Sequence, residues 1–355
     1  MRIIDADAHV LEIDKTWDYM DPSVRQYRPQ LVSETLASGE VSKSWAIDGR
    51  LFSAPYPGGG KFSMLGPHSD NVALSDDSKF LLDVQARVRH MDELGTDVQI
   101  LYPTIFLSPI SEKPEVEHGV RRSYNRWLAD VWAESKGRLR WAAVLPLYDM
   151  DEALEELSFA KDNGACGIFM RGVELGDRLL IDEYFYPLYD RLSELDMPMC
   201  IHAGNGSFDI DRIWAPPNAT FARAKFPGVS AFHQLLYTAT PDKFPQLRIG
   251  FVELSSQWLP YVLHDLERRV QRRGREWTGD ALRKNRMWVA CQTNDDHETI
   301  MRYVGDDNLM LGTDYGHADT STEIYALQEF RKHEGLSSVT INKILDDNPV
   351  AFYSL

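Results

Sequence analysis

Residues 83–104 read DVQARVRHMDELGTDVQILYPT, and this stretch contains the repeating unit on which the fold prediction rests. In its first half, apolar side chains recur every three or four residues, which places them on one face of a helix. Gly95 is a typical helix stop, and the apolar run after it is typical of a buried strand. The stretch is therefore predicted to form an amphipathic helix followed by a strand.

The same helix and strand pair recurs along the rest of the chain. Apolar runs predict further strands at 139–146, 165–172, 197–204, 247–254, 286–293 and 308–316, and a strand within residues 3–12 precedes them all. Strands that alternate with helices form a parallel sheet, because each crossover returns the chain to the same end of the sheet. Eight such units, with no GxGxxG motif after the first strand, predict an α/β fold that closes into a (β/α)8 TIM barrel rather than an open dinucleotide-binding sheet.

Residues 11–80 interrupt this regular pattern. They are rich in proline, glycine, serine and aromatic residues, with a predicted hairpin at 42–53 and a predicted loop at 55–62. We therefore expect a single domain, residues 1–355, in which residues 11–80 form an insertion after the first strand. Such an insertion is a candidate lid. Its aromatic side chains either contact an apolar or aromatic substrate or pack the insertion on the barrel or on a second subunit.

The composition excludes two classes of partner. With 38 basic and 54 acidic residues, the net charge of -16 repels nucleic acid and anionic membranes. The sequence shows no signal-peptide pattern and no run of about 18 apolar residues, so we expect a cytoplasmic protein. Cys166, Cys200 and Cys291 each lie in an apolar, strand-like run and are expected to be buried free thiols.

Side chains with the chemistry of metal ligands end four of the predicted strands. They are Asp5, Asp7 and His9 on the first strand, His202, Glu253 and Asp314 on three later strands, and His317 three residues further on. The three on the first strand alternate along it and so share one face. A single aspartate after a strand is often a helix cap. Convergence from four strands at the end where TIM barrels place their chemistry predicts a metal-dependent active site instead.

Taken together, these residues resemble the amidohydrolase superfamily, and within it the amidohydrolase-2 branch that includes aminocarboxymuconate-semialdehyde decarboxylase and the resorcylate decarboxylases. The resemblance rests on the segments DADAH (5–9), DVQILYPT (97–104), IHAG (201–204), FPQLRIGFVELSSQWLPY (244–261), LMLGTDYGHAD (309–319) and KILDDNPVAFY (343–353). It implies a divalent metal bound by Asp7, His9, His202 and Asp314.

Two positions depart from the pattern of that branch. Asp7 stands where many relatives have a histidine, and Glu253 stands where the decarboxylases carry a catalytic histidine. In addition, no lysine ends the strand at 165–172, so the carbamylated lysine of some binuclear relatives has no counterpart. The decarboxylase mechanism therefore does not carry over residue by residue.

The predicted ligand set leaves the metal and the reaction open. It is rich in oxygen, which suits Mn or Fe as well as Zn. The excess of carboxylates means either that Asp5 and Glu253 orient the ligands or that a second metal is bound. Three reactions follow: hydrolysis through a metal-bound water, with Asp314 or Glu253 as the base; non-oxidative decarboxylation; and oxygenation at a dinuclear Fe or Mn site. The expected substrate is a small organic molecule that is cyclic or carries a carboxylate.

Two further residues, His233 and Arg171, are candidates for the site, and His317 has a second interpretation. His233 is interpreted as an acid, a base or a ligand, and the alternative is a surface position at the start of a helix. His317 is interpreted as a catalytic residue that orients a ligand or contacts substrate, and the alternative is loop packing. Arg171 ends a strand and either binds a substrate carboxylate or forms an ion pair at the barrel rim. We also expect a homo- or hetero-oligomer, and a subunit that needs a partner chain for activity stays an alternative.

Overall fold

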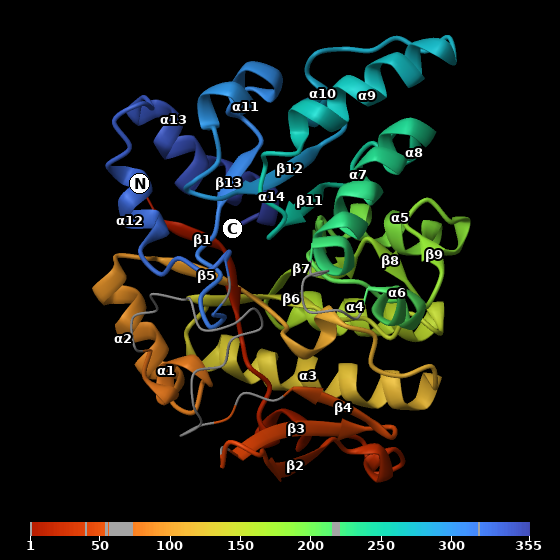
Figure 1. Ribbon diagram of the computed structural model, residues 1–355, viewed down its shortest axis with the longest axis vertical. Coiled ribbons are helices and arrows are strands. Elements are labelled where there is room, and N and C mark those ends of the chain that lie inside the picture. Colours follow the sequence, from red (N-terminus) through yellow and green to blue (C-terminus); the bar gives the residue numbers. More distant parts are fainter. Residues whose placement is uncertain (1, 40, 54–55, 57–73, 215–220, 319) are drawn as a thin grey trace.

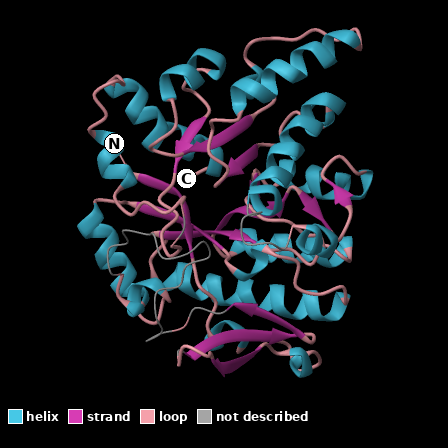
Figure 2. Cartoon of the chain, viewed as in Figure 1, coloured by secondary structure: helices cyan, strands magenta, loops and turns pink. Residues whose placement is uncertain are grey.

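The computed structural model describes residues 2–39, 41–53, 56, 74–214, 221–318 and 320–355. Eight parallel strands form one sheet in the order in which they occur in the chain, with helices around them (Figures 1 and 2). The strands are β1 (Ile4–His9), β5 (Val98–Tyr102), β6 (Leu139–Ala143), β7 (Ala165–Arg171), β10 (Met199–His202), β11 (Ile249–Val252), β12 (Met287–Cys291) and β13 (Leu309–Leu311). This arrangement confirms the predicted (β/α)8 barrel.

The barrel closes between its first strand and its last. The amide of His9 donates a hydrogen bond to the carbonyl of Tyr315 at 2.7 Å, and the amide of Asp314 donates to the carbonyl of Asp7 at 2.9 Å. Only glycine fits at Gly312, because a Cβ there would lie 2.2 Å from the Cβ of Asp7. The seam of the barrel therefore runs through the residues predicted to bind metal.

Helices connect the strands and cover the outside of the barrel. They are α1 (Asp76–Lys79), α2 (Val84–Leu94), α3 (Pro114–Glu134), α4 (Met150–Asp162), α5 (Tyr186–Glu194), α6 (Phe208–Ile213), α7 (Phe226–Thr238), α8 (Thr240–Lys243), α9 (Leu259–Arg272), α10 (Ala281–Lys284), α11 (His297–Val304), α12 (Ala326–Arg331), α13 (Ser338–Asn342) and α14 (Asn348–Tyr353). In α2, the Asp83 side chain accepts from the Gln85 amide at the start, and Gly95 at φ +65° ends the helix as predicted. No helix among the described residues is long and apolar enough to cross a membrane.

The insertion after β1 contains a small antiparallel sheet of β2 (Gln30–Thr35), β3 (Val41–Ile47) and β4 (Arg50–Ser53), which lies below α3 in Figure 1. The predicted hairpin is confirmed, with Asp48 and Gly49 both at positive φ in its turn. Trp17 and Trp45 are buried against each other with ring centroids 5.8 Å apart, so these two aromatic residues pack the insertion. The loop predicted at 55–62 lies outside the described residues except for Tyr56. The single-domain boundary and the lid stay predictions.

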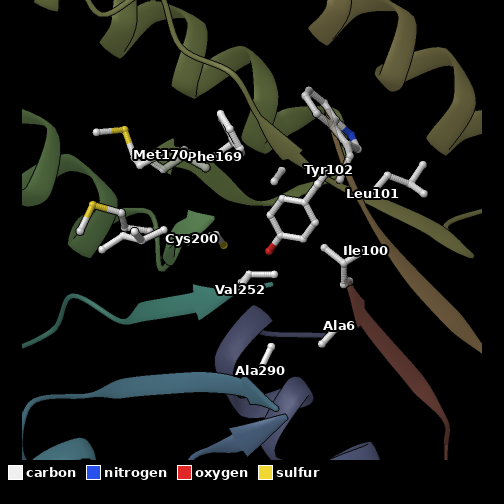
Figure 3. Packing of buried hydrophobic residues seen from close by; sticks show 14 of the residues in the cluster. Ala6, Ile100, Leu101, Tyr102, Phe169, Met170, Cys200, Val252 and Ala290 are labelled. Carbon is white, nitrogen blue, oxygen red and sulfur yellow. The ribbon is translucent and has the colours of Figure 1, made fainter. Parts of the chain in front are cut away.

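Apolar side chains fill the interior of the barrel (Figure 3). Tyr102 points its hydroxyl group among Ala6, Cys200 and Val252. That hydroxyl donates to the hydroxyl of Tyr353 at 2.7 Å, because the Tyr353 hydroxyl itself donates to the Ala6 carbonyl at 2.9 Å. All three cysteines are buried and free, as predicted. The polar residues at the strand ends therefore lie on a rigid, closely packed base.

Candidate metal centre

Four strand ends bring carboxylates and imidazoles together in a buried cluster. The structure contains two overlapping groups of four, Asp7, His9, His202 and Glu253, and His9, Glu253, Asp314 and His317. Within each group, one potential ligand atom of every residue lies within 4.8 Å of the others. All six side chains are buried, so solvent screens the charges within the cluster only weakly.

The hydrogen bonds of His9 identify which of its nitrogen atoms faces the cluster. Its Nδ1 lies 3.1 Å from the carbonyl of Pro103, which can only accept, so Nδ1 carries the proton. Burial and the neighbouring histidines lower the pKa of His9 well below its ordinary value, so the ring is neutral. The lone pair of Nε2 then faces carboxylate oxygens of Asp314, Asp7 and Glu253 at 3.4, 3.5 and 3.8 Å. A nitrogen lone pair surrounded by three carboxylates is stabilised by a cation between them.

His202 is oriented by similar contacts, with one ring nitrogen at a backbone carbonyl and the other at a carboxylate. Its Nδ1 lies 3.1 Å from the Ala203 carbonyl, and its Nε2 lies 3.3 Å from Oδ1 of Asp7. Burial alone would lower the pKa of His202, but the hydrogen bond and the charge of Asp7 raise it above its ordinary value. For Asp7, burial is outweighed by His202 and His9, so the pKa of this carboxyl lies below its usual range. Asp7 is thus ionised and able to bind a proton donor or a metal.

His317 is oriented by the hydroxyl of Thr104. That hydroxyl donates its one proton to the carbonyl of Val10 at 2.7 Å, so it accepts from Nε2 of His317 at 2.9 Å. Nδ1 of His317 therefore faces Oδ1 of Asp314 at 2.8 Å. The ring also stacks on His9, with centroids 3.7 Å apart. Either a proton or a cation is needed between Nδ1 and the Asp314 carboxylate.

The backbone is strained at two of the cluster's carboxylates. Glu253 and Asp314 adopt φ values of +56° and +51°, which residues with a side chain rarely do. The other oxygen of Asp314, Oδ2, accepts from the Thr322 hydroxyl at 2.7 Å, which orients the side chain. Strained backbone of this kind concentrates at functional sites, where the surrounding structure holds it in place.

Asp5 lies one position deeper on β1 and belongs to neither group of four found among the described residues. Its two oxygens accept from the amide and hydroxyl of Thr313 at 2.9 and 2.6 Å and from the Gln99 amide at 2.9 Å. Burial raises the pKa of Asp5 to about 6 in spite of these donors. Because its oxygens are already engaged, Asp5 supports the end of β13 and is not placed as a metal ligand. This corresponds to the orienting role that the sequence left open.

Arg171 is buried, and most of its donors are engaged within the protein. Its Nε and Nη2 donate to the Glu174 carboxylate, and its Nη1 lies within hydrogen-bond distance of the carbonyls of Phe106, Ser108 and Asn205. The guanidinium group thus links loops at the barrel rim. These contacts favour the ion pair that the sequence left as the alternative, and binding of a substrate carboxylate by Arg171 stays a prediction.

His233 lies on α7, away from the cluster. Its Nε2 contacts Oδ2 of Asp265 on α9 at 3.0 Å, and about a quarter of its side chain, 27%, is exposed. The predicted role as an acid, base or ligand is therefore not supported by its position, because the ring connects two outer helices.

Sequence reasoning missed the residues that orient the cluster. Thr104 is the last residue of the predicted strand 97–104, so a polar residue at a strand end could have identified it. Thr322 gives no such signal, since it follows β13 by eleven residues and reaches Asp314 only through the folded loop.

Sequence comparison identifies relatives of this chain among known proteins. A family model described as Amidohydrolase matches residues 4–355. Gamma-resorcylate decarboxylase from Polaromonas sp. is 29% identical over 203 residues, which cover 53% of this chain and 61% of that protein. The matched region thus spans less than two thirds of the length of this curated relative.

Solved structures share the fold at lower identity. An amidohydrolase from Mycobacterium avium subsp. paratuberculosis aligns with a TM-score of 0.83 and 20% identity over 100% of this chain and 98% of that chain. A 5-carboxyvanillate decarboxylase from Novosphingobium aromaticivorans, complexed with manganese and 4-hydroxy-3-methoxy-5-nitrobenzoic acid, aligns with a TM-score of 0.62 and 23% identity over 76% of this chain and 79% of that chain.

Proposed function

The chain belongs to the amidohydrolase family, as the sequence resemblance implied, and on this premise we propose that it is a metal-dependent enzyme that removes carbon dioxide from a small aromatic carboxylate without an oxidant. The observation that carries the proposal is the neutral His9, whose Nε2 lone pair faces three carboxylate oxygens at 3.4 to 3.8 Å. The names of the decarboxylase relatives support the choice of reaction.

The donor set fits a divalent cation. The resemblance implies that Asp7, His9, His202 and Asp314 would hold it. The geometry groups the first three with Glu253, and places Asp314 in a second group that shares His9 and Glu253. Two imidazole nitrogens and several carboxylate oxygens suit Mn or Fe, and Zn is also compatible. When bound, the cation would neutralise the carboxylates and act as a Lewis acid that orients and polarises the substrate's oxygens.

Decarboxylation also requires a proton donor, because the ring carbon that loses carbon dioxide takes up one proton in its place. His317 and Asp314 are suited to this step, since Nδ1 and Oδ1 lie 2.8 Å apart and can hold a proton between them. Thr104 keeps the ring in this orientation through Nε2. With His317 and Asp314 as the proton donor, the proposed decarboxylase does not need the catalytic histidine that the resemblance implies at the position of Glu253.

A dinuclear oxygenase is the second candidate, because the two groups of four share His9 and Glu253. An imidazole nitrogen offers one lone pair to one metal, whereas the carboxylate of Glu253 has two oxygens and can serve two ions. Such a site with Fe or Mn would consume molecular oxygen. Hydrolysis of a cyclic or carboxylate-bearing substrate uses the same donors and is tested alongside.

The deciding experiment combines metal analysis with product analysis. The full chain is purified without added metal, its metal content is measured, and it is then loaded with Mn²⁺, Fe²⁺ or Zn²⁺. It is incubated with 2,6-dihydroxybenzoate, 5-carboxyvanillate, and small esters and lactones. We expect about one metal per chain and conversion of a carboxylate to the corresponding phenol and carbon dioxide, without oxygen uptake. Two metals per chain with oxygen uptake would favour the oxygenase, and absence of metal binding would contradict all three reactions.

A further inference from the structure

The turn between β11 and α9 carries Glu253 in an unusual backbone conformation. Both Glu253 and Ser255 have left-handed φ values, +56° and +60°, although neither is glycine. Such conformations persist only where neighbouring groups hold the backbone in place. The contacts of the Glu253 carboxylate with His9 and His202 do not by themselves hold this turn.

One buried carboxylate, that of Asp295, collects hydrogen bonds from this turn. Its Oδ1 accepts from the Ser255 hydroxyl at 2.6 Å, and its Oδ2 accepts from the amide and hydroxyl of Ser256 at 2.8 and 2.7 Å. Oδ2 also accepts from the amide of Gln292, in the loop after β12 that carries Asp295 itself. Asp295 therefore ties the turn after β11 to the loop after the neighbouring strand.

The same turn controls where the Glu253 side chain lies. Its Oε2 is 3.6 Å from Nδ1 of His202 and 3.8 Å from Nε2 of His9, positions that depend on the backbone two residues before Ser255. The indole of Trp258 donates to the Ser255 carbonyl at 2.7 Å and stabilises the turn from its other side. A change of φ at either left-handed residue would move the carboxylate away from both imidazoles.

We propose that Asp295 is a positioning residue, which fixes the turn 253–256 so that Glu253 presents its carboxylate to a divalent cation at the cluster. The proposal rests on the proposed function, because it assumes that the cluster binds a cation. Asp295 itself does not touch the cluster, and it acts only through the hydrogen bonds to Ser255 and Ser256.

The test uses Asp295→Asn with a matched control next to it. Asparagine keeps the size of the side chain but replaces one acceptor oxygen by a donor, which then faces the donors of the turn. Asp296→Asn is the control, because the Asp296 side chain caps its own helix, α11, by accepting from the Thr299 amide at 3.0 Å. Equilibrium binding of Mn²⁺ to the metal-free full chain is expected to weaken about 10- to 100-fold in Asp295→Asn. In Asp296→Asn it should change by less than about twofold.

A double-mutant cycle separates positioning from general destabilisation. If Asp295 acts through Glu253, Asp295→Asn should cause no further loss of Mn²⁺ affinity in a Glu253→Ala background. Unchanged affinity in Asp295→Asn, or the same loss with and without Glu253, would overturn the proposal.

Hydrogen exchange of the metal-free protein gives a readout independent of the metal. The amides of residues 254–257 should exchange faster in Asp295→Asn and at the original rate in Asp296→Asn. Unchanged exchange in Asp295→Asn would contradict the role of Asp295 in holding the turn. Failure of the unsubstituted protein to bind any of the three metals would instead contradict the proposed function, and would limit Asp295 to the turn that the exchange measures.

Discussion

Two parts of the barrel rim use buried charge in opposite ways. At β7, Arg171 and Glu174 form a buried ion pair in which the cation is surrounded by acceptors of the protein itself. At β1 and β13, the neutral His9 faces the carboxylates of Asp7 and Asp314. The first arrangement is complete without a ligand, whereas the second is stabilised by a cation from outside. The difference indicates that the β7 rim serves stability and the β1–β13 rim serves binding.

Asp314→Asn should give the largest effect and act on binding alone. Asparagine tolerates the φ of +51° better than alanine and can still accept from Thr322, but it removes a charged ligand. We expect Mn²⁺ affinity and turnover to fall on the order of a thousandfold, beyond the loss typical of an orienting residue. The free energy of unfolding of the metal-free protein should not fall, because one of several facing carboxylates is neutralised. Calorimetric titration and chemical denaturation measure the two quantities.

Arg171→Met should lower the free energy of unfolding and leave metal affinity unchanged. It leaves the carboxylate of Glu174 buried without its cation, which is expected to cost about 3–5 kcal/mol of unfolding free energy. The Mn²⁺ affinity of the folded fraction should stay unchanged. Arg178→Met is the control, because its ion pair with Asp182 is more than a third exposed and should contribute about 1 kcal/mol or less. A large loss of Mn²⁺ affinity in folded Arg171→Met would remove the distinction between the two rims.

Added metal should stabilise only through the β1–β13 rim. At a free Mn²⁺ concentration 100 times Kd, the unfolding free energy of the unsubstituted protein is expected to rise by about 2.7 kcal/mol. The Arg178→Met variant should show the same gain, and Asp314→Asn should show none at that concentration. Denaturation with and without Mn²⁺ provides the measurement, and an equal gain in all three would indicate binding elsewhere.

Glu12, just after β1, should give the smallest effect, which depends on pH. Its carboxylate accepts from the amides of Thr104 and Ile105, and burial raises its pKa from 4.5 to about 7. The folded state therefore binds this proton more tightly than the unfolded state. The resulting stability is complete below pH 4.5 and is lost as the pH rises through 7. Relative to Glu12→Gln, the unsubstituted protein should lose on the order of 1 kcal/mol per pH unit between pH 5 and 7. Parallel pH profiles of the two proteins would show that Glu12 does not titrate in this range.

The fold could be predicted from sequence because each unit of it is local. Residues 83–104 contain an apolar helical face, a glycine stop and an apolar strand, and each of these signals acts within a few residues. The alternation of such units then restricts the topology to parallel strands. The structure confirms the barrel that these local signals predict.

The candidate site was only partly predictable, because position on a strand end is local but hydrogen bonding is not. The sequence placed Asp7 and His202 at strand ends, and the structure brings them within 3.3 Å. The sequence could not show that donors of Arg171 are engaged by Glu174 and by three carbonyls from distant loops. The same limit applies to His233, whose contact with Asp265 joins two helices 32 residues apart in sequence.

The seam of the barrel has a consequence for how the chain folds. Thr313 donates to Asp5 across 308 residues of sequence, and Asp314 stands beside it. A ribosome-bound chain that has not yet released this last strand can neither close the barrel nor complete the cluster. The group of potential ligands that contains Asp314 and His317 would therefore assemble late in biosynthesis, after this strand has been translated.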